Sequence, residues 1–396
     1  MATSKRLVLL GAGASVPADL PTATKMTTLM ASDDGELTDE LGDTTREIIR
    51  FAAGGIQMRR GVQGENPLHE VNIEEVITAV EMLANREELE ISPFVSQWHR
   101  AVPKMGEARK QDGHSRLDRR IRDVMQEATS SDDNPRRRTR DASRRLAEAL
   151  QYYFGEFQSP FHDNVFDLAL EQVTTLLIDL LLLEDAARTT YLDPLVRKAD
   201  EQQVTIATLN YDNTIELAAE RLGLSLEVGL REWNEYGRLP NPDSGIELLK
   251  LHGSIDWVRN EERASGESLF PTVEIGRRNT GESAVDKRSP AIIFGTRNKL
   301  TEEGPFLDLF QTFKKRLDDC SELVVIGYSF GDAHVNHVIQ NWMNQDTKRR
   351  IIVVDRPGID EENHPFWQQN RRLQSTDRVQ LRAIGTEQGI SDLFAN

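Results

Sequence analysis

The sequence predicts an α/β fold in which a doubly wound parallel sheet is interrupted by a large helical insertion. Short runs rich in Val, Ile and Leu lie between turn residues, and helical patterns follow several of them. Residues 11–203, which separate the first strong run from the second, are dominated by helical patterns. Strands buried on both faces are continuously apolar rather than alternating, and their alternation with helices is typical of a doubly wound core.

The predicted strands fall into a stronger and a weaker group. Four short, continuously apolar runs form the stronger group: Leu7–Leu10, Val204–Leu209, Leu323–Ile326 and Ile351–Val354. Three weaker candidates are Glu247–Leu251, Ala291–Phe294 and Val379–Ala383. Helices are expected over Asn213–Arg221 and Val335–Trp342. This order predicts a sheet covered by helices on both faces.

The insertion is expected to be helical. We assign residues 1–30 and 200–396 to the sheet domain and residues 31–199 to the insertion. Asn72 is a predicted N-cap, and Glu75 follows at the spacing of a capping box. Two more helices are predicted at about Arg144–Tyr153 and Val165–Arg188. Acidic residues interrupt the second of these, which therefore predicts a buried core helix rather than a membrane span.

The composition excludes several classes of protein. The 396 residues carry a formal net charge of -17, which disfavours sequence-independent attraction to nucleic acid and to anionic membranes. A single cysteine excludes an internal disulfide and a four-thiolate zinc site, and it favours a reducing compartment. The first apolar stretch is too short for a signal peptide. We expect a soluble cytoplasmic protein with no metal, no membrane contact and no strong direct binding to nucleic acid.

One segment is locally basic within this acidic chain. Residues 100–145 hold 14 Lys or Arg against 8 Asp or Glu. A solvated helix face beside a loop is one interpretation, and a docking surface for an acidic partner or nucleic acid is the other. The sequence leaves both open.

A glycine-rich turn, Gly11-Ala12-Gly13-Ala14-Ser15, follows the first predicted strand. Glycine lets the backbone approach a pyrophosphate closely, and the start of a following helix offers N–H groups to it. The turn therefore predicts a nucleotide site. Close packing of the backbone is the alternative, because the full GxGxxG fingerprint is absent.

Polar residues also follow the strand Val204–Leu209, which runs into Asn210-Tyr211-Asp212-Asn213. Ligands of open α/β sheets bind beyond the carboxyl ends of the strands, so Asn210 and Asp212 are candidate site residues. The amide of Asn210 can donate and accept at once, which suits a sugar hydroxyl or a water. Helix capping is the alternative for Asp212 and Asn213.

His252 ends the apolar run Leu248-Leu249-Lys250-Leu251. A histidine is well suited to accept a proton from a hydroxyl at neutral pH, so this residue is a candidate base. Burial in the core is the alternative. We expect Trp257 in the core, and Asp256 either as a helix cap or as the residue that orients His252.

The order of these motifs resembles the sirtuin family, and the resemblance continues through Gly327-Tyr328-Ser329-Phe330-Gly331-Asp332. It covers residues 1–30 and about 200–395, and it implies a Rossmann-like sheet that binds NAD+. The site residues that it implies divide into two roles. Asn210 and His252 would be catalytic, and the residues that bind NAD+ would be Gly11, Ala12, Gly13, Ser15, Asp212, Gly327, Ser329 and Asp355.

Two departures argue against protein deacylation. Deacylating sirtuins carry a zinc module of two CxxC pairs, and this chain has one cysteine. The segment after the first glycines, Val16 to Thr24, also differs from the family pattern. The motif Asn72–Val76, together with Gly327–Asp332, is similar to the sirtuin-like effectors of bacterial antiviral defence. That resemblance implies an NAD+ glycohydrolase that depletes NAD+ in abortive infection, self-associates and pairs with a HerA-type hexameric ATPase or an Argonaute-like protein.

Two other functions stay open. A non-catalytic subunit that senses NAD or ADP-ribose would carry the same motifs. A dehydrogenase is disfavoured, because no acidic residue ends a strand about 20 residues after Gly13.

Overall fold

The computed structural model describes residues 6–32, 41–86, 165–239, 244–260, 274–277, 290–292, 304–360, 362, 364–370 and 376–395. The chain divides into two compact units, one of Met1–Lys25 with Leu177–Asn396 and one of Met26–Leu176. The first unit takes in residues 177–199, which the sequence analysis assigned to the insertion. The reason is that Leu192, Leu195 and Val196 pack in the core of the sheet.

The first unit is built on a seven-stranded sheet with the order β10-β9-β8-β1-β2-β4-β3. Every pairing in it is parallel. The strands are β1 (Arg6–Leu10), β2 (Thr205–Thr208), β3 (Leu226–Glu227), β4 (Ile246–Lys250), β8 (Glu322–Ile326), β9 (Arg350–Asp355) and β10 (Val379–Ala383). This sheet confirms the predicted doubly wound α/β fold.

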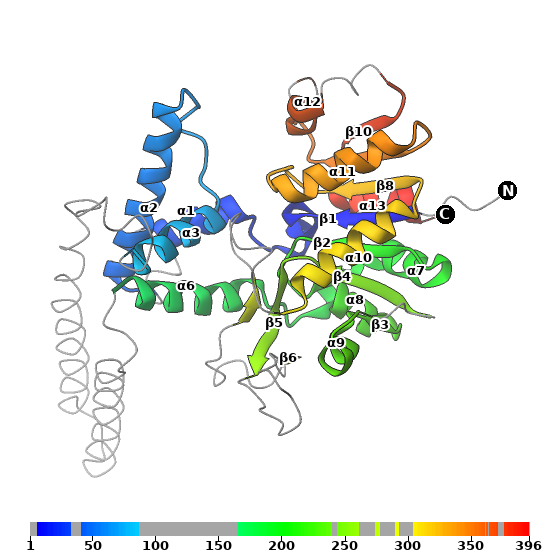
Figure 1. Cartoon of the computed structure of the whole chain (residues 1–396), viewed down its shortest axis with the longest axis horizontal. Helices are drawn as coiled ribbons and strands as arrows, with labels where there is room; N and C mark the ends of the chain where they lie inside the picture. The colour runs from blue at the N-terminus through cyan, green and yellow to red at the C-terminus, as the bar shows by residue number, and fades with distance from the viewer. Residues whose placement is uncertain are drawn as a thin grey trace, which may run out of the picture. The chain divides into compact units, whose positions relative to one another are not determined.

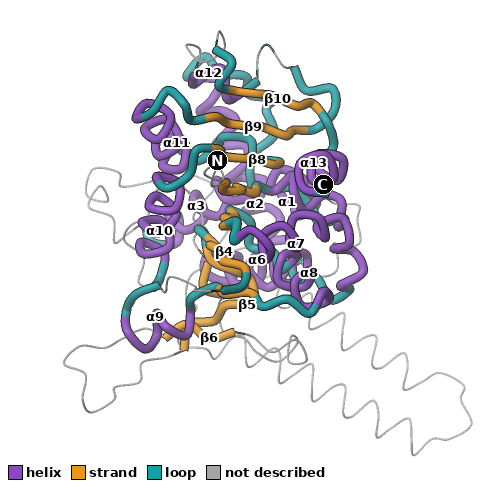
Figure 2. Tube along the Cα trace, turned by 90° about the vertical axis from the view of Figure 1, so that its right-hand side faces the viewer, coloured by secondary structure: helices purple, strands orange, loops and turns teal. Residues whose placement is uncertain are grey.

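Helices cover both faces of the sheet because its central strands are apolar on both faces (Figures 1 and 2). Leu7 and Leu9 of β1 point into one core, together with residues of α10 (Phe306–Asp318) and α11 (Ala333–Gln345). Val8 and Leu10 point into the other core, which the remaining long helices of this unit complete. Those helices are α7 (Asp193–Gln202), α8 (Thr214–Leu222) and α13 (Thr386–Phe394).

Shorter elements complete this unit. They are the 3-10 helices η1 (Ala12–Ala18) and η3 (Ala186–Leu192), and the α-helices α9 (Leu230–Tyr236) and α12 (Pro365–Asn370). A second, antiparallel sheet has the order β6-β5-β7, with β5 (Gly253–Asn260), β6 (Glu274–Arg277) and β7 (Pro290–Ile292). The strand predicted at Ala291–Phe294 is described only as far as Ile292, and it pairs in this small sheet with β5. Trp257 of β5 lies in the core as expected.

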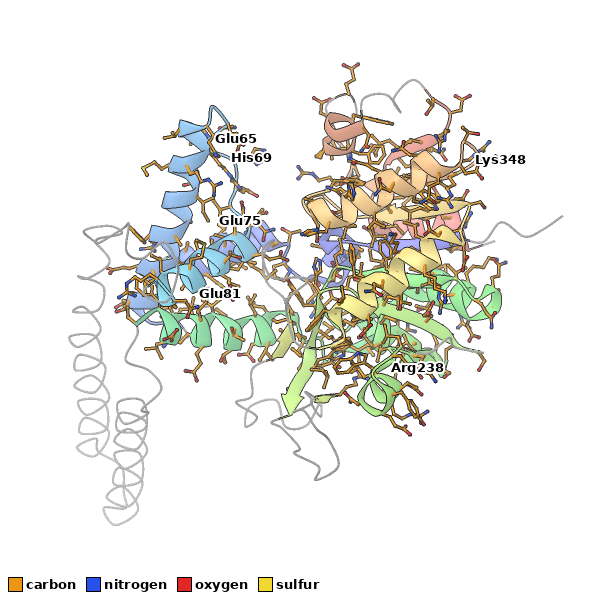
Figure 3. All side chains as sticks on the ribbon, in the orientation of Figure 1. Glu65, His69, Glu75, Glu81, Arg238 and Lys348 are labelled. Carbon is orange, nitrogen blue, oxygen red and sulfur yellow. The ribbon has the colours of Figure 1, made fainter. Side chains whose placement is uncertain are left out.

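The described helices of the second unit are α2 (Asp43–Val62), α3 (Ile73–Ala84) and most of α1 (Ala23–Ala31) and α6 (Val165–Leu181). The capping box at Asn72 is confirmed: its side chain accepts from the backbone at Glu74, and Glu75 accepts from the backbone of Asn72. Arg60 of α2 forms an ion pair of 2.7 Å with Glu75, which Figure 3 labels at the start of α3.

One predicted helix of the insertion ends earlier in the structure than expected, and other predictions fall outside the described residues. Helix α6 ends at Leu181 rather than at Arg188, and η3 follows it. The predicted helix Arg144–Tyr153 and the basic segment 100–145 lie outside the described residues. None of the helices in the described ranges is both long enough and apolar enough to cross a bilayer.

Candidate functional site

The strand order reverses at β1. Strands β2, β3 and β4 lie on one side of β1, whereas β8, β9 and β10 lie on the other. In open α/β sheets, this reversal separates the loops that follow the two central strands and makes the carboxyl edge there the expected ligand site. The loops in question begin at Gly11, after β1, and at Gly327, after β8.

These two glycine loops interlock. The amide of Gly11 donates to the carbonyl of Ile326 (2.9 Å), and the amide of Gly13 donates to the carbonyl of Gly327 (2.8 Å). A Cβ on Gly13 would lie 2.8 Å from the Cα of Gly327, and Gly327 itself has a φ of +64°. Close packing therefore requires both glycines. Because backbone carbonyls already accept from the amides of Gly11 and Gly13, those two N–H groups are not donors for a phosphate.

The loop that η1 forms is held by side chains from two other elements. Tyr191 of η3 donates to the carbonyl of Ala14 (2.8 Å), and Thr386 of α13 donates to the carbonyl of Gly13 (2.9 Å). Ala12 is exposed, whereas Ser15 is buried. Burial raises the pKa of Tyr191 far above its ordinary range, and the nearby Asp212 carboxylate adds to this effect. This phenol therefore stays protonated and acts as a donor at neutral pH.

Asn210, Asp212 and Ser15 share one set of hydrogen bonds. The amide nitrogen of Asn210 donates to the carbonyl of Gly11 (2.9 Å) and to the hydroxyl of Ser15 (3.0 Å). The Ser15 hydroxyl donates to Asp212 Oδ2 (2.6 Å). Since both N–H groups of the carboxamide are used inside the protein, a ligand hydroxyl would meet its carbonyl oxygen as an acceptor.

Asp212 also caps α8. Its Oδ1 accepts from the backbone N–H of Thr214 (3.1 Å) and from the Thr214 hydroxyl (2.7 Å), and the residue is 6% exposed. The capping alternative therefore holds for Asp212. Asn213 has a different role, because its side chain exchanges hydrogen bonds with the backbone of Leu183.

A buried charge network, which was not predicted from the sequence, contacts this cluster at the carbonyl of Asp212. The ammonium of Lys250, on β4, donates to the carbonyl of Asp212 (2.5 Å) and to Glu216 Oε1 (2.8 Å). Burial raises the pKa of Glu216 and outweighs the opposing effect of Lys250. Burial also acts to raise the pKa of Asp256, but there Lys250 and Arg277 prevail and lower it. A lysine within an apolar strand run was the available signal for such a network.

His252 follows β4, next to the end of β2, and it is 5% exposed. Its Nε2 lies 3.0 Å from Oδ2 of Asp332, at the end of the Gly327–Asp332 motif. The ring centroid of Tyr211 is 6.3 Å from that of His252. Asp256 does not orient the imidazole, since its carboxylate accepts from Arg277 Nε at 2.8 Å. Protein therefore encloses the predicted base.

The other predicted binding residues follow β8 and β9. Ser329 is exposed, and Phe330 beside it has a φ of +56° while its ring packs against Tyr328 and Phe366. Asp355 ends β9, and its Oδ2 lies 3.0 Å from Nε2 of His364, a buried residue that the sequence analysis missed. Three or more metal-ligating side chains do not gather anywhere in the described ranges.

The structure thus brings Gly11, Ser15, Asn210 and Asp212 into direct contact and packs Gly327 against Gly13. His252 follows β4, adjacent to the strand that leads into Asn210. Ser329 and Asp355 follow the strands on the other side of β1. All of these residues lie at or beyond the carboxyl ends of strands.

Comparisons with known proteins give a family match and distant structural similarities. The sequence has no match among the curated proteins. A Sir2 homolog in complex with NAD is 12% identical, with a TM-score of 0.39 and coverage of 100% of this chain and 90% of that one. Sir2Tm bound to a propionylated peptide is 11% identical, with a TM-score of 0.35 and coverage of 58% and 80%. A family model described as "SIR2-like domain" matches residues 204–374. The residues that match the SIR2-like domain include the strands that lead into Asn210, His252 and Gly327.

Proposed function

We propose that this chain is an NAD+ glycohydrolase that cleaves the bond between nicotinamide and ribose to give nicotinamide and ADP-ribose. The observation that carries the proposal is the hydrogen-bonded cluster of Gly11, Ser15, Asn210 and Asp212 at the point where the strand order reverses. The SIR2-like match over residues 204–374 supports NAD+ as the ligand.

The proposed chemistry relies on positioning. Nicotinamide leaves as a neutral ring, because its nitrogen is cationic in NAD+, so the protein does not need to protonate it. Positive charge builds on the ribose C1′, and water adds to the vacant face. The carbonyl oxygen of Asn210 would accept from a ribose hydroxyl or from that water, and His252 would take the proton that the water loses.

The burial of His252 supports a proposal about how the activity is regulated. Unregulated destruction of NAD+ would kill the host cell, and a base that is 5% exposed suits an idle state. We therefore propose a gated effector of bacterial anti-phage defence that causes abortive infection when a partner opens the site. The proposed partner is a HerA-type hexameric ATPase or, alternatively, an Argonaute-like protein. We also expect this chain to self-associate.

The decisive experiment measures nicotinamide release from NAD+ by the purified chain, alone and with the product of the neighbouring gene. His252→Ala should lower turnover by roughly 10²–10⁴-fold, the usual contribution of a general base, while NAD+ binding measured by calorimetry persists. His337→Ala is the matched control, because His337 is exposed on α11 and bonds to Asn341. Wild-type turnover in His252→Ala would refute the assigned base.

A non-catalytic sensor of NAD or ADP-ribose is the second candidate. The burial of His252 favours it, since an enclosed imidazole can serve packing alone. Assay of the complete assembly separates the two functions: an enzyme releases nicotinamide there, whereas a sensor binds the nucleotide and releases none.

A further inference from the structure

The partner of His252 defines which of its nitrogens carries the proton. Asp332 Oδ2 lies 3.0 Å from Nε2, and both side chains are 7% exposed. The other carboxylate oxygen, Oδ1, accepts from the backbone N–H groups of His334 (2.9 Å) and Val335 (3.3 Å) at the start of α11. Two amide donors and the positive end of the helix favour the ionised carboxylate.

An ionised carboxylate only accepts hydrogen bonds. Nε2 of His252 must therefore be the protonated nitrogen, and in the neutral ring the lone pair lies on Nδ1. The contacts of a second histidine–carboxylate pair, His364 with Asp355, indicate the same tautomer. His364 Nδ1 accepts from the amide of Phe366 (3.1 Å), so its Nε2–H points to Asp355.

Asp332 is well placed to hold the ring in a fixed orientation. Its own backbone N–H donates to the hydroxyl of Tyr328 (3.0 Å), and that hydroxyl lies 2.9 Å from Oδ1 of Asn336. The carboxylate is thus fixed through the backbone and through the first turn of α11 at once. Asp256, the only acidic residue that follows His252 closely in sequence, is bound to Arg277 instead.

We propose that Asp332 is the positioning residue for His252 and that it makes Nδ1 the atom that receives the proton. This inference rests on the proposed NAD+ hydrolysis. As the C1′–N bond breaks, its electron pair leaves with nicotinamide. The water oxygen bonds to C1′, one water O–H bond breaks, and that proton goes to Nδ1. Asp332 stabilises the imidazolium that forms and does not itself take the proton.

The test is Asp332→Asn. Asparagine caps a helix as well as aspartate does, so α11 should keep its first turn and the thermal midpoint should change little. Its amide, however, presents an N–H group to Nε2 of His252, which would move the ring proton to Nδ1 and remove the base. We expect kcat to fall by roughly 10²–10⁴-fold while KM changes little. Asp185→Asn, which alters the exposed cap of η3, is the matched control and should keep wild-type turnover.

A second readout does not depend on turnover. In protein labelled with ¹⁵N-histidine, His252 of the wild type should show a protonated Nε2, and the Asp332→Asn variant should show the opposite tautomer. Wild-type kcat in Asp332→Asn, or a wild-type ring protonated on Nδ1, would overturn the inference. If the complete assembly releases no nicotinamide although Nε2 carries the proton, the proposed function fails and the pairing of Asp332 with His252 stands.

Discussion

Replacing Lys250 with methionine tests the network behind the predicted site. The side chain of Lys250 is fully buried, and its ammonium bonds to Glu216 at 2.8 Å and to the carbonyl of Asp212 at 2.5 Å. Methionine has a similar length and packs well in irregular cores, but it donates no hydrogen bond. The substitution therefore leaves a buried carboxyl and a buried carbonyl without their shared donor.

The expected loss of unfolding free energy is large. Removing one partner of a buried ion pair typically costs about 3–5 kcal/mol. The lower end of this range is expected here, because burial already raises the pKa of Glu216, so this carboxyl can take up a proton when Lys250 is absent. Even about 3 kcal/mol is a large part of the ~5–15 kcal/mol by which folded domains are stable. Because the loop of Asn210 loses an anchor, turnover of NAD+ should fall as well.

Urea unfolding followed by circular dichroism measures the effect, with linear extrapolation to water. The double variant Lys250→Met/Glu216→Met should recover part of the loss, since an apolar pair can replace a buried ion pair at little cost. Lys348→Met is the control, because Lys348 is exposed (Figure 3). A loss below about 1 kcal/mol for Lys250→Met, or a double variant no more stable than the single one, would show that the ion pair does not hold the loop.

Two further predictions concern Gly327, after β8, and Asp256, on β5. Gly327→Ala should destabilise the protein by more than about 1 kcal/mol in urea unfolding, because the new Cβ would lie 2.3 Å from the amide nitrogen of Ala14; an unchanged midpoint would contradict the interlocked loops. Asp256→Asn should lower stability at neutral pH. The pKa of this carboxyl is below its ordinary 3.8 in the folded protein, so its contribution is present above that value and is lost as pH falls through the folded pKa. The difference between Asp256→Asn and wild type should therefore shrink in acid, and a constant difference from pH 7 downward would refute the assignment.

The strands could be predicted because burial on both faces leaves a continuous apolar run. The run Val379–Ala383 coincides with β10, and the four strong runs coincide with β1, β2, β8 and β9 to within one residue at each end. The capping box at Asn72 was also predictable, because it depends on residues three positions apart. Patterns of this kind depend only on residues that lie close together in the sequence.

The partners of the charged residues could not be predicted in the same way. His252 and Asp332 are 80 positions apart, and Lys250 and Glu216 are 34 apart. Which carboxylate meets which cation depends on the order of the strands, which brings distant segments to one edge. Asp256, the near neighbour in sequence, was therefore a candidate either for a helix cap or for orienting His252, whereas the fold places Asp332 against the imidazole.

The contacts of α13 with β1 and η1 have a consequence for biosynthesis. Thr386 holds the carbonyl of Gly13, and Arg6 donates to the carbonyl of Leu393, so segments more than 370 positions apart stabilise one another. A ribosome makes the glycine loop early and its last anchor very late. A nascent polypeptide that already contains Asn210, His252 and Asp332 still lacks α13, so Thr386 can hold this loop only after translation has passed that helix.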